Sequence, residues 1–257
     1  MNKQTLACTT LLLLSAVAGA EDGGPAATPY RPSVSIPAAM PVPGWLDVEF
    51  GLARSEGGGD KRRQSLPVAA KLAFTPEWGL VVGSELGVRR TDAGGAVYTG
   101  QGDLTVLAKR YIAGASEGTA WGIAAGFKLP TAKDSIGSDK SDAILTGIYS
   151  ADWAGGNHVD ANLGVVRLGA YGSGEGRQQY GWAAAFAHAL DERWSVFVEP
   201  SGTYRSGAAS TGQVMLGASY AADKRVVFDI AVSKRVTQAG PDWQVLAGVT
   251  VLLARLW

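Results

Sequence analysis

Apolar and polar residues alternate with a period of two in about a dozen short segments, and this pattern constrains the fold more than any other feature of the chain. Successive side chains of a β-strand point to opposite faces, so each segment is predicted to be a strand with one apolar face. The segments cover residues 45–54, 64–75, 78–90, 101–112, 118–129, 142–153, 157–169, 178–190, 193–205, 212–221, 225–235 and 243–256. The chain is therefore predicted to be all-β.

The links between these segments alternate in length. Tight links such as 113–117 are followed by long, polar or glycine-rich links such as 130–141. Outer-membrane barrels combine short periplasmic turns, longer external loops and an even number of strands. Residues 45–257 are therefore predicted to form a transmembrane antiparallel up-and-down β-barrel of about 12 strands. The alternative is a soluble β-sandwich, which would not expose an apolar face on nearly every strand.

Tryptophans give a second indication of a membrane-spanning barrel. Several fall at strand ends, where indole rings lie at the boundary between lipid tails and headgroups. The predicted aromatic girdle consists of Trp78, Trp121, Trp153, Trp194, Trp243 and Trp257, with Trp243 at the outer side. The last strand ends on Trp257 and resembles the C-terminal signal by which outer-membrane barrels are recognised for assembly. The barrel-assembly machinery and outer-membrane lipid are therefore expected partners.

The N-terminus predicts export. Residues 1–20 have the basic start, the apolar core and the small terminal residues of a signal peptide, with cleavage expected after Ala20. The mature protein is therefore expected in the bacterial outer membrane. Residues 21–44 are rich in Pro and Ala and are predicted to be a periplasmic leader, most simply a mobile tail. The alternative is that this leader enters the barrel as a plug.

The polar faces of the strands carry charged residues that are predicted to line the lumen. They are Asp47, Glu49, Lys71, Glu85, Arg89, Lys109, Lys128, Asp160, Glu199 and Asp229. Such a set can filter solutes at a constriction, or its members can pair and hold a polar interior together. Because both signs occur, no strong selectivity for anions or cations is expected. About 12 strands lie between a filled barrel and an open porin, which predicts a narrow or partly blocked path for small solutes.

One stretch carries a family resemblance. Residues 126–142 read Gly-Phe-Lys-Leu-Pro-Thr-Ala-Lys-Asp-Ser-Ile-Gly-Ser-Asp-Lys-Ser-Asp. They resemble the Leu-Pro-Thr-Gly strand end and following loop of the bacterial outer-membrane transporter family named for the meta-pathway of phenol degradation, with Ala132 in place of the usual glycine. The resemblance implies an outer-membrane channel for passive passage of small solutes, aromatic or hydrophobic compounds among them. It implies no catalytic residues.

Other classes of function find less support. The 23 basic and 23 acidic residues cancel, so nucleic acid is not an expected partner. No metal-ligand spacing occurs, and neither a metal nor a cofactor is predicted. An outer-membrane lipid-modifying enzyme would need an acid and a serine beside His158 or His188. A structural or adhesion barrel, the other alternative, would have a lumen closed by paired charges or by residues 21–44.

Overall fold

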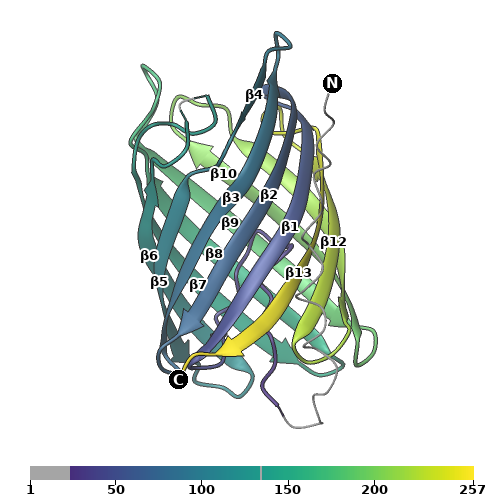
Figure 1. Cartoon of the computed structure of the whole chain (residues 1–257). Coiled ribbons are helices and arrows are strands. Elements are labelled where there is room, and N and C mark those ends of the chain that lie inside the picture. The colour runs from purple at the N-terminus through teal and green to yellow at the C-terminus, as the bar shows by residue number, and fades with distance from the viewer. Residues whose placement is uncertain (1–23, 134) are drawn as a thin grey trace, which may run out of the picture.

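The computed structural model describes residues 24–133 and 135–257. The predicted signal peptide and its cleavage site lie outside the described residues. The described chain forms one 13-stranded antiparallel sheet that closes on itself (Figure 1). The strands are β1 (Trp45–Gly57), β2 (Asp60–Ala73), β3 (Trp78–Asp92), β4 (Val97–Gly100), β5 (Leu104–Ala113), β6 (Thr119–Leu129), β7 (Asp142–Trp153), β8 (Asn157–Arg167), β9 (Gln178–Ala189), β10 (Trp194–Arg205), β11 (Thr211–Ala221), β12 (Val226–Arg235) and β13 (Trp243–Arg255). No helix among the described residues is long and apolar enough to span a membrane.

The barrel closes through its first and last strands. β1 pairs with β13 on one side and with β2 on the other. β4 and β5 share one position in the wall, because β3 pairs with β4 near its end, where Arg90 faces Tyr98, and with β5 near its start, where Val81 faces Leu107. The strands therefore occupy 12 positions around the wall. The predicted all-β, antiparallel barrel is confirmed.

The links between strands define two ends of the barrel, here called the short-turn end and the long-loop end. The links 74–77, 114–118, 154–156, 190–193 and 222–225 lie at the short-turn end, and 130–141, 168–177, 206–210 and 236–242 lie at the long-loop end. The link predicted over residues 55–63 is much shorter, because β1 and β2 continue to a tight turn. Gly57 and Gly58 have φ of 87° and 76° there, which glycine adopts without a Cβ clash.

Aspartates close two of the short turns. Asp191 accepts the backbone N–H groups of Arg193 and Trp194, both at 2.7 Å. These two donors hold the pKa of Asp191 below its usual range. Asp223 repeats the arrangement in the turn 222–225. A side chain that bonds its own backbone in this way explains why four residues suffice to reverse the chain.

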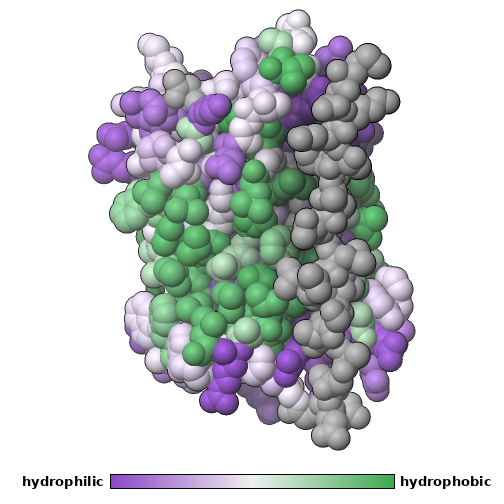
Figure 2. All heavy atoms as spheres, viewed as in Figure 1, coloured by the Kyte–Doolittle hydropathy of each residue, from purple (hydrophilic) through white to green (hydrophobic). Residues whose placement is uncertain are grey.

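The outer surface carries a broad apolar belt. Figure 2 shows apolar residues across the middle of the visible face and polar residues toward both ends. Trp243 is partly exposed, and the guanidinium of Arg54 lies 5.7 Å from its ring centre. An apolar belt with exposed tryptophans suits a lipid-facing wall, and contact of these rings with lipid stays a prediction. The other tryptophans of the predicted girdle are between 46% and 57% exposed: Trp78, Trp121, Trp153, Trp194 and Trp257.

A β-bulge interrupts the pairing of β2 with β3. Ser65 pairs with Val88, whereas Pro67 pairs with Glu85, so β3 has one more residue than β2 between these two pairs. An extra residue in one strand reverses the face on which the following side chains lie. The alternation of β3 therefore changes phase after Glu85.

This bulge corrects the predicted position of Arg89. Val88 turns inward and is only 4% exposed, whereas Arg89 is exposed and pairs with the exposed Gln64. The prediction that Arg89 lines the lumen is therefore wrong. The next residue, Arg90, forms an ion pair instead: its Nε lies 2.5 Å from the carboxylate of Asp60.

Candidate functional site

Residues 24–44, here called the lumenal segment, lie inside the barrel near its short-turn end (Figure 1). The backbone N–H of Ala27 donates to Lys224 at 2.7 Å, and that of Gly44 donates to Ala73 at 3.0 Å, so both ends of the segment lie at the short-turn end. The segment therefore enters and leaves by the same opening. The sequence favoured a mobile periplasmic tail, but the structure has the alternative arrangement, a plug, because side chains of the wall bind the segment.

Two carboxylates of β1 accept backbone N–H groups of the lumenal segment. The N–H of Thr28 donates to Asp47 at 2.8 Å, and the N–H of Tyr30 donates to Glu49 at 2.6 Å. Inward-facing residues of a strand are two apart, and so are the residues of the segment that they bind. Both carboxylates are almost completely buried. Lys71 of β2 pairs with both of them, at 3.1 Å from Asp47 and 2.6 Å from Glu49, so the segment and the wall together supply the donors that these buried carboxylates need.

Glu199 of β10 holds the middle of the segment. It is 0% exposed and accepts three hydrogen bonds, from the Ser33 hydroxyl at 2.9 Å and from the N–H groups of Val34 at 2.8 Å and Ser35 at 2.6 Å. Hydrogen bonds to an ionised acceptor are stronger than neutral ones. Within the described residues, every donor to Glu199 belongs to the lumenal segment.

Two uncharged side chains continue this row of acceptors. Asn162 of β8 accepts the N–H of Ile36 at 2.8 Å and donates to the carbonyl of Ile36 at 3.0 Å. Ser150 of β7 accepts the N–H of Ala38 at 2.8 Å. The sequence analysis missed both side chains, because an uncharged polar residue on an inward face has no distinctive signal.

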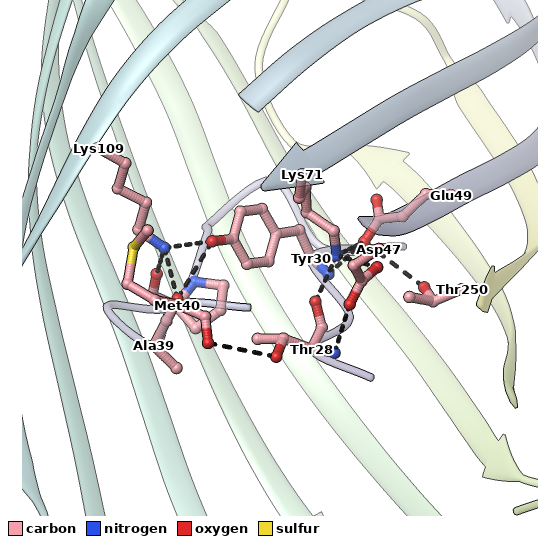
Figure 3. Close-up of polar contacts among 10 residues, drawn as sticks. Thr28, Tyr30, Ala39, Met40, Asp47, Glu49, Lys71, Lys109 and Thr250 are labelled. Carbon is pink, nitrogen blue, oxygen red and sulfur yellow. Dashed lines mark hydrogen bonds and ion pairs between the residues drawn. The ribbon is translucent and has the colours of Figure 1, made fainter. Parts of the chain in front are cut away.

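Tyr30 lies between two buried lysines (Figure 3). The ammonium nitrogens of Lys71 and Lys109 are each 4.3 Å from the centre of the Tyr30 ring, which suits cation–π attraction. Lys71 also lies 2.6 Å from Glu49, and Lys109 donates to the Tyr30 hydroxyl at 2.5 Å and to the carbonyl of Ala39 at 2.7 Å. Tyr30 is an isolated aromatic residue in a Pro- and Ala-rich stretch, and that was the available sequence signal for an anchor.

Arg31 lies against the wall where two glycines leave room for it. Its guanidinium donates to the carbonyl of Ala247 at 3.1 Å and is 3.5 Å from the carboxylate of Asp229. A Cβ added to Gly248 would lie 2.6 Å from the Arg31 Nε, and one added to Gly51 would also overlap the guanidinium. The small residues of β1 and β13 therefore make the space that this arginine occupies.

Two other predicted lumen charges pair within the wall. Glu85 lies 2.5 Å from Arg63, and Lys128 lies 3.1 Å from Asp103 and 3.0 Å from Asp142. Glu85, Arg63 and Lys128 are partly exposed, whereas the side chains of Asp103 and Asp142 are largely buried. All five lie toward the long-loop end. The role of the predicted charges as a solute filter stays a prediction.

The histidines do not form a catalytic site with a serine. His158 is 2.7 Å from Asp152 through Nδ1 and 3.0 Å from Asp160 through Nε2. Ser150 donates to Asp160 and not to the imidazole, so His158 has no ring nitrogen placed to take a serine proton. His188 is exposed, and its Nδ1 contacts an asparagine at 3.0 Å. Among the residues that the structure describes, no three His, Cys, Asp or Glu side chains come together as a metal site requires.

Two cavities lie on the long-loop side of the lumenal segment. The larger has a volume of about 460 Å³ and is lined by Val34 and Ile36 of the segment. The smaller has a volume of about 270 Å³ and is lined by Arg31 and Val34. Because Val34 lines both, the segment forms a common floor. The wall of the larger cavity includes Leu107, Thr146, Val166, Gln179, Thr203 and Gln213.

A comparison with protein families shows the family of the chain. Residues 65–253 match the model of a family described as "Putative MetA-pathway of phenol degradation". The chain belongs to this family. The match extends from β2 to β13, and the lumenal segment lies outside it. The resemblance seen in residues 126–142 is therefore confirmed. No curated protein sequence matches the chain.

Solved structures share the fold at low sequence identity. An outer membrane channel from Pseudomonas putida F1 matches with a TM-score of 0.65 and 13% identity, over 83% of this chain and 97% of that one. The KdgM porin matches with a TM-score of 0.56 and 10% identity, over 80% and 98% of the two chains. The CymD monoaromatic hydrocarbon channel matches with a TM-score of 0.51 and 8% identity, over 84% and 90%. The fold is thus one that outer-membrane channels and porins use.

Proposed function

We propose that the protein is an outer-membrane channel for passive passage of small solutes, closed in this state by the lumenal segment. The proposal rests on one observation: the lumen is obstructed by a separate segment and not by side chains of the wall. Cavities of about 460 and 270 Å³ lie within the barrel, and a separate segment forms their floor. In a structural barrel the wall's own side chains would fill this space. Membership of the family and the likeness to channels and porins support the proposal.

The larger cavity favours small uncharged solutes with apolar parts. Leu107 and Val166 give it apolar walls, while Gln179 and Thr203 offer hydrogen-bonding groups. Its charged side chain, Arg235, is 2.5 Å from an aspartate and is therefore already paired. Sites of this composition bind compounds that bury apolar surface and make few directed polar contacts. Aromatic or hydrophobic compounds fit this cavity better than ions, and CymD is named a monoaromatic hydrocarbon channel.

The same proposal assigns no catalytic activity to the chain. A lipid-modifying enzyme needs a serine whose proton a histidine accepts, and the two carboxylates beside His158 leave no nitrogen for that role. The apolar belt would contact lipid, and the barrel-assembly machinery would recognise β13 with its terminal Trp257. Cleavage after Ala20 would release the exported protein. An adhesion barrel is disfavoured because its lumen has no need for a separable floor.

Conductance measurements test the channel directly. The protein starting at residue 21 and a form lacking residues 24–44 would be refolded, and barrel formation would be checked by heat-dependent gel mobility. In planar bilayers we expect rare openings of the first protein and stable, discrete steps from the second. Liposome swelling would then rank neutral aromatic solutes against sugars and salts. Silence of both proteins, once they are shown to be folded, would overturn the channel.

A further inference from the structure

We infer that the short-turn half of the lumen is a binding site for the main chain of an extended peptide, and that the lumenal segment occupies it as an internal, exchangeable ligand. The inference goes beyond the proposed channel, which requires only that something obstructs the lumen. It rests on which atoms of the segment the wall contacts.

The wall binds the backbone of the segment at more positions than its side chains. Six backbone N–H groups donate to wall side chains, those of residues 28, 30, 34, 35, 36 and 38. Four backbone carbonyls, those of residues 28, 36, 37 and 39, accept from Lys71, Asn162 or Lys109. Polar side chains of the segment reach the wall at three positions, Tyr30, Arg31 and Ser33.

Residues 34–38 show this mode most clearly. The side chains of Val34 and Ile36 line the larger cavity, while their N–H groups donate to Glu199 and Asn162. Asn162 bonds both the N–H and the carbonyl of Ile36, as a neighbouring β-strand would. The Val34 side chain is 50% exposed, so a different side chain at residue 34 would leave these bonds intact, whereas Ile36 also packs against the buried Ile148 of the wall. The site therefore recognises an extended backbone and tolerates a change of sequence where the side chain faces the cavity, as at residue 34.

The emptied site would still bind peptide donors. Glu199 is completely buried and receives its described hydrogen bonds from the segment alone, so withdrawal of the segment leaves a charge that lacks its donors. Both ends of the segment lie at the short-turn end, so it can withdraw as a loop without crossing the wall. A second extended peptide that enters by the same opening meets the same row of acceptors.

Proline substitutions test main-chain recognition, because proline removes a backbone N–H. The reporter is Ser35→Cys in the full chain with Cys8→Ser, where the new thiol replaces a side chain that is only 1% exposed. Val34→Pro deletes one donor to Glu199, and Val34→Ala removes the side chain but keeps that donor. We expect Val34→Pro to raise the rate of maleimide labelling roughly ten- to hundredfold, since a hydrogen bond to a charged group contributes about that factor to an equilibrium. Val34→Ala should stay within about threefold of the parent protein.

A second pair of variants, at residue 38, controls for a distortion of the backbone that is confined to residue 34. Ala38→Pro removes the donor to Ser150, and Ala38→Gly keeps it. We expect the proline variant alone to expose the reporter thiol at residue 35, in protein whose gel mobility shows a folded barrel. Equal labelling of the proline and non-proline variants at both sites would overturn the inference, because side-chain packing would then hold the segment.

A free peptide tests the exchange. A fluorescent peptide with the sequence of residues 27–40 would be added to the full-chain Val34→Pro variant in detergent micelles and followed by anisotropy. We expect saturable binding to this variant and at least about tenfold weaker binding to the Val34→Ala protein. A peptide with alanine at residue 34 should bind like the original. A peptide N-methylated at residues 35 and 36 should not bind, because it lacks two donors.

The two readouts separate this inference from the channel function. Failure of the unmodified peptide to bind a variant whose reporter thiol at residue 35 reacts freely would overturn the peptide site and leave the channel standing. Peptide binding with no conductance from any folded variant would support the peptide site and overturn the channel.

Discussion

The two halves of the lumen hold their charges in different ways. In the short-turn half, buried carboxylates bind the backbone of the lumenal segment: Glu199 receives its described donors from the segment alone, and Glu49 is shared between the segment and Lys71 of the wall. In the long-loop half, partly exposed charges pair with side chains of neighbouring strands or loops, as Glu85 does with Arg63. Other pairs of that half are Asp60 with Arg90, Asp142 with Lys128, Glu175 with Arg205 and Asp242 with Arg235.

This difference shows which part of the wall is complete without the segment. Solvated ion pairs contribute little to stability, and those of the long-loop half need nothing from the lumen. A buried carboxylate without donors is costly, and Glu199 would be one without the segment, so the short-turn half depends on a segment from outside the sheet. The segment is therefore both the closure of the path and a structural partner of the wall.

The largest effect is expected from loss of the central acceptor. Glu199→Leu leaves one hydroxyl and two backbone N–H groups of the segment without their acceptor; at about 1–3 kcal/mol for each orphaned group, it should lower the free energy of unfolding by about 3–5 kcal/mol. Glu199→Gln keeps an acceptor oxygen and should cost less. The matched change in the other half, Glu85→Leu, breaks a partly exposed pair and should cost no more than about 1 kcal/mol. Urea unfolding in lipid vesicles, followed by tryptophan fluorescence, measures all three; equal costs at residues 85 and 199 would contradict the comparison.

Loss of a buried lysine should have the next largest effect. Lys109→Met removes donors to the Tyr30 hydroxyl and to the carbonyls of Pro37 and Ala39, and each orphaned polar group costs about 1–3 kcal/mol unless water reaches it. We expect more frequent openings in planar bilayers. Lys128→Met, the control in the long-loop half, should leave the opening frequency unchanged. An equal rise from both variants would show that the lysines act through the net charge of the lumen.

A smaller effect is expected where the wall makes room for Arg31. Gly51→Ala places a Cβ within 2.6 Å of three guanidinium atoms of Arg31 and should cost about 1–3 kcal/mol, as overpacking does. Gly59→Ala, in the β1–β2 turn, meets no atom within 4 Å and should be close to neutral. Thermal unfolding of the two variants measures both losses of stability. A neutral Gly51→Ala would mean that Arg31 can leave the wall freely.

The smallest effect concerns ion selectivity. With the segment withdrawn, the short-turn half has the carboxylates of residues 47, 49, 160, 199 and 229 against two lysines, Lys71 and Lys109, a balance of 2 − 5 = −3, or −2 when His158 is protonated. The Val34→Pro variant should therefore prefer cations by a few-fold, about one decade at most, in reversal potentials under a salt gradient. Adding Glu199→Gln should reduce this preference, whereas Glu85→Gln should change it less. An anion preference would show that the segment stays in place.

The strands themselves could be predicted because their signal is local. A period of two fixes which side chains share a face, and the alternation of tight and long links sets the up-and-down order. The change of phase at Arg89 could not be predicted, since a bulge depends on the pairing of β3 with β2 and not on the composition of either strand. One extra residue was enough to move this arginine to the outer face.

Of the candidate site, only the residues that the wall contributes could be predicted from the sequence. Asp47, Glu49, Lys71, Lys109 and Glu199 stand out as charges on strand faces that point inward. Their partners could not be read in the same way, because a Pro- and Ala-rich stretch has the composition of a mobile tail. Ser35 and Glu199 are 164 residues apart in the chain.

The sequence by itself determined the strands, most of their outward and inward faces, the number of positions in the wall and the family. Tertiary structure alone decided where residues 24–44 lie and which atoms hold them. The physical reason is that an extended segment without regular secondary structure has no local preference for one place. Its position follows from acceptors that become neighbours only when β1, β7, β8 and β10 close into one barrel.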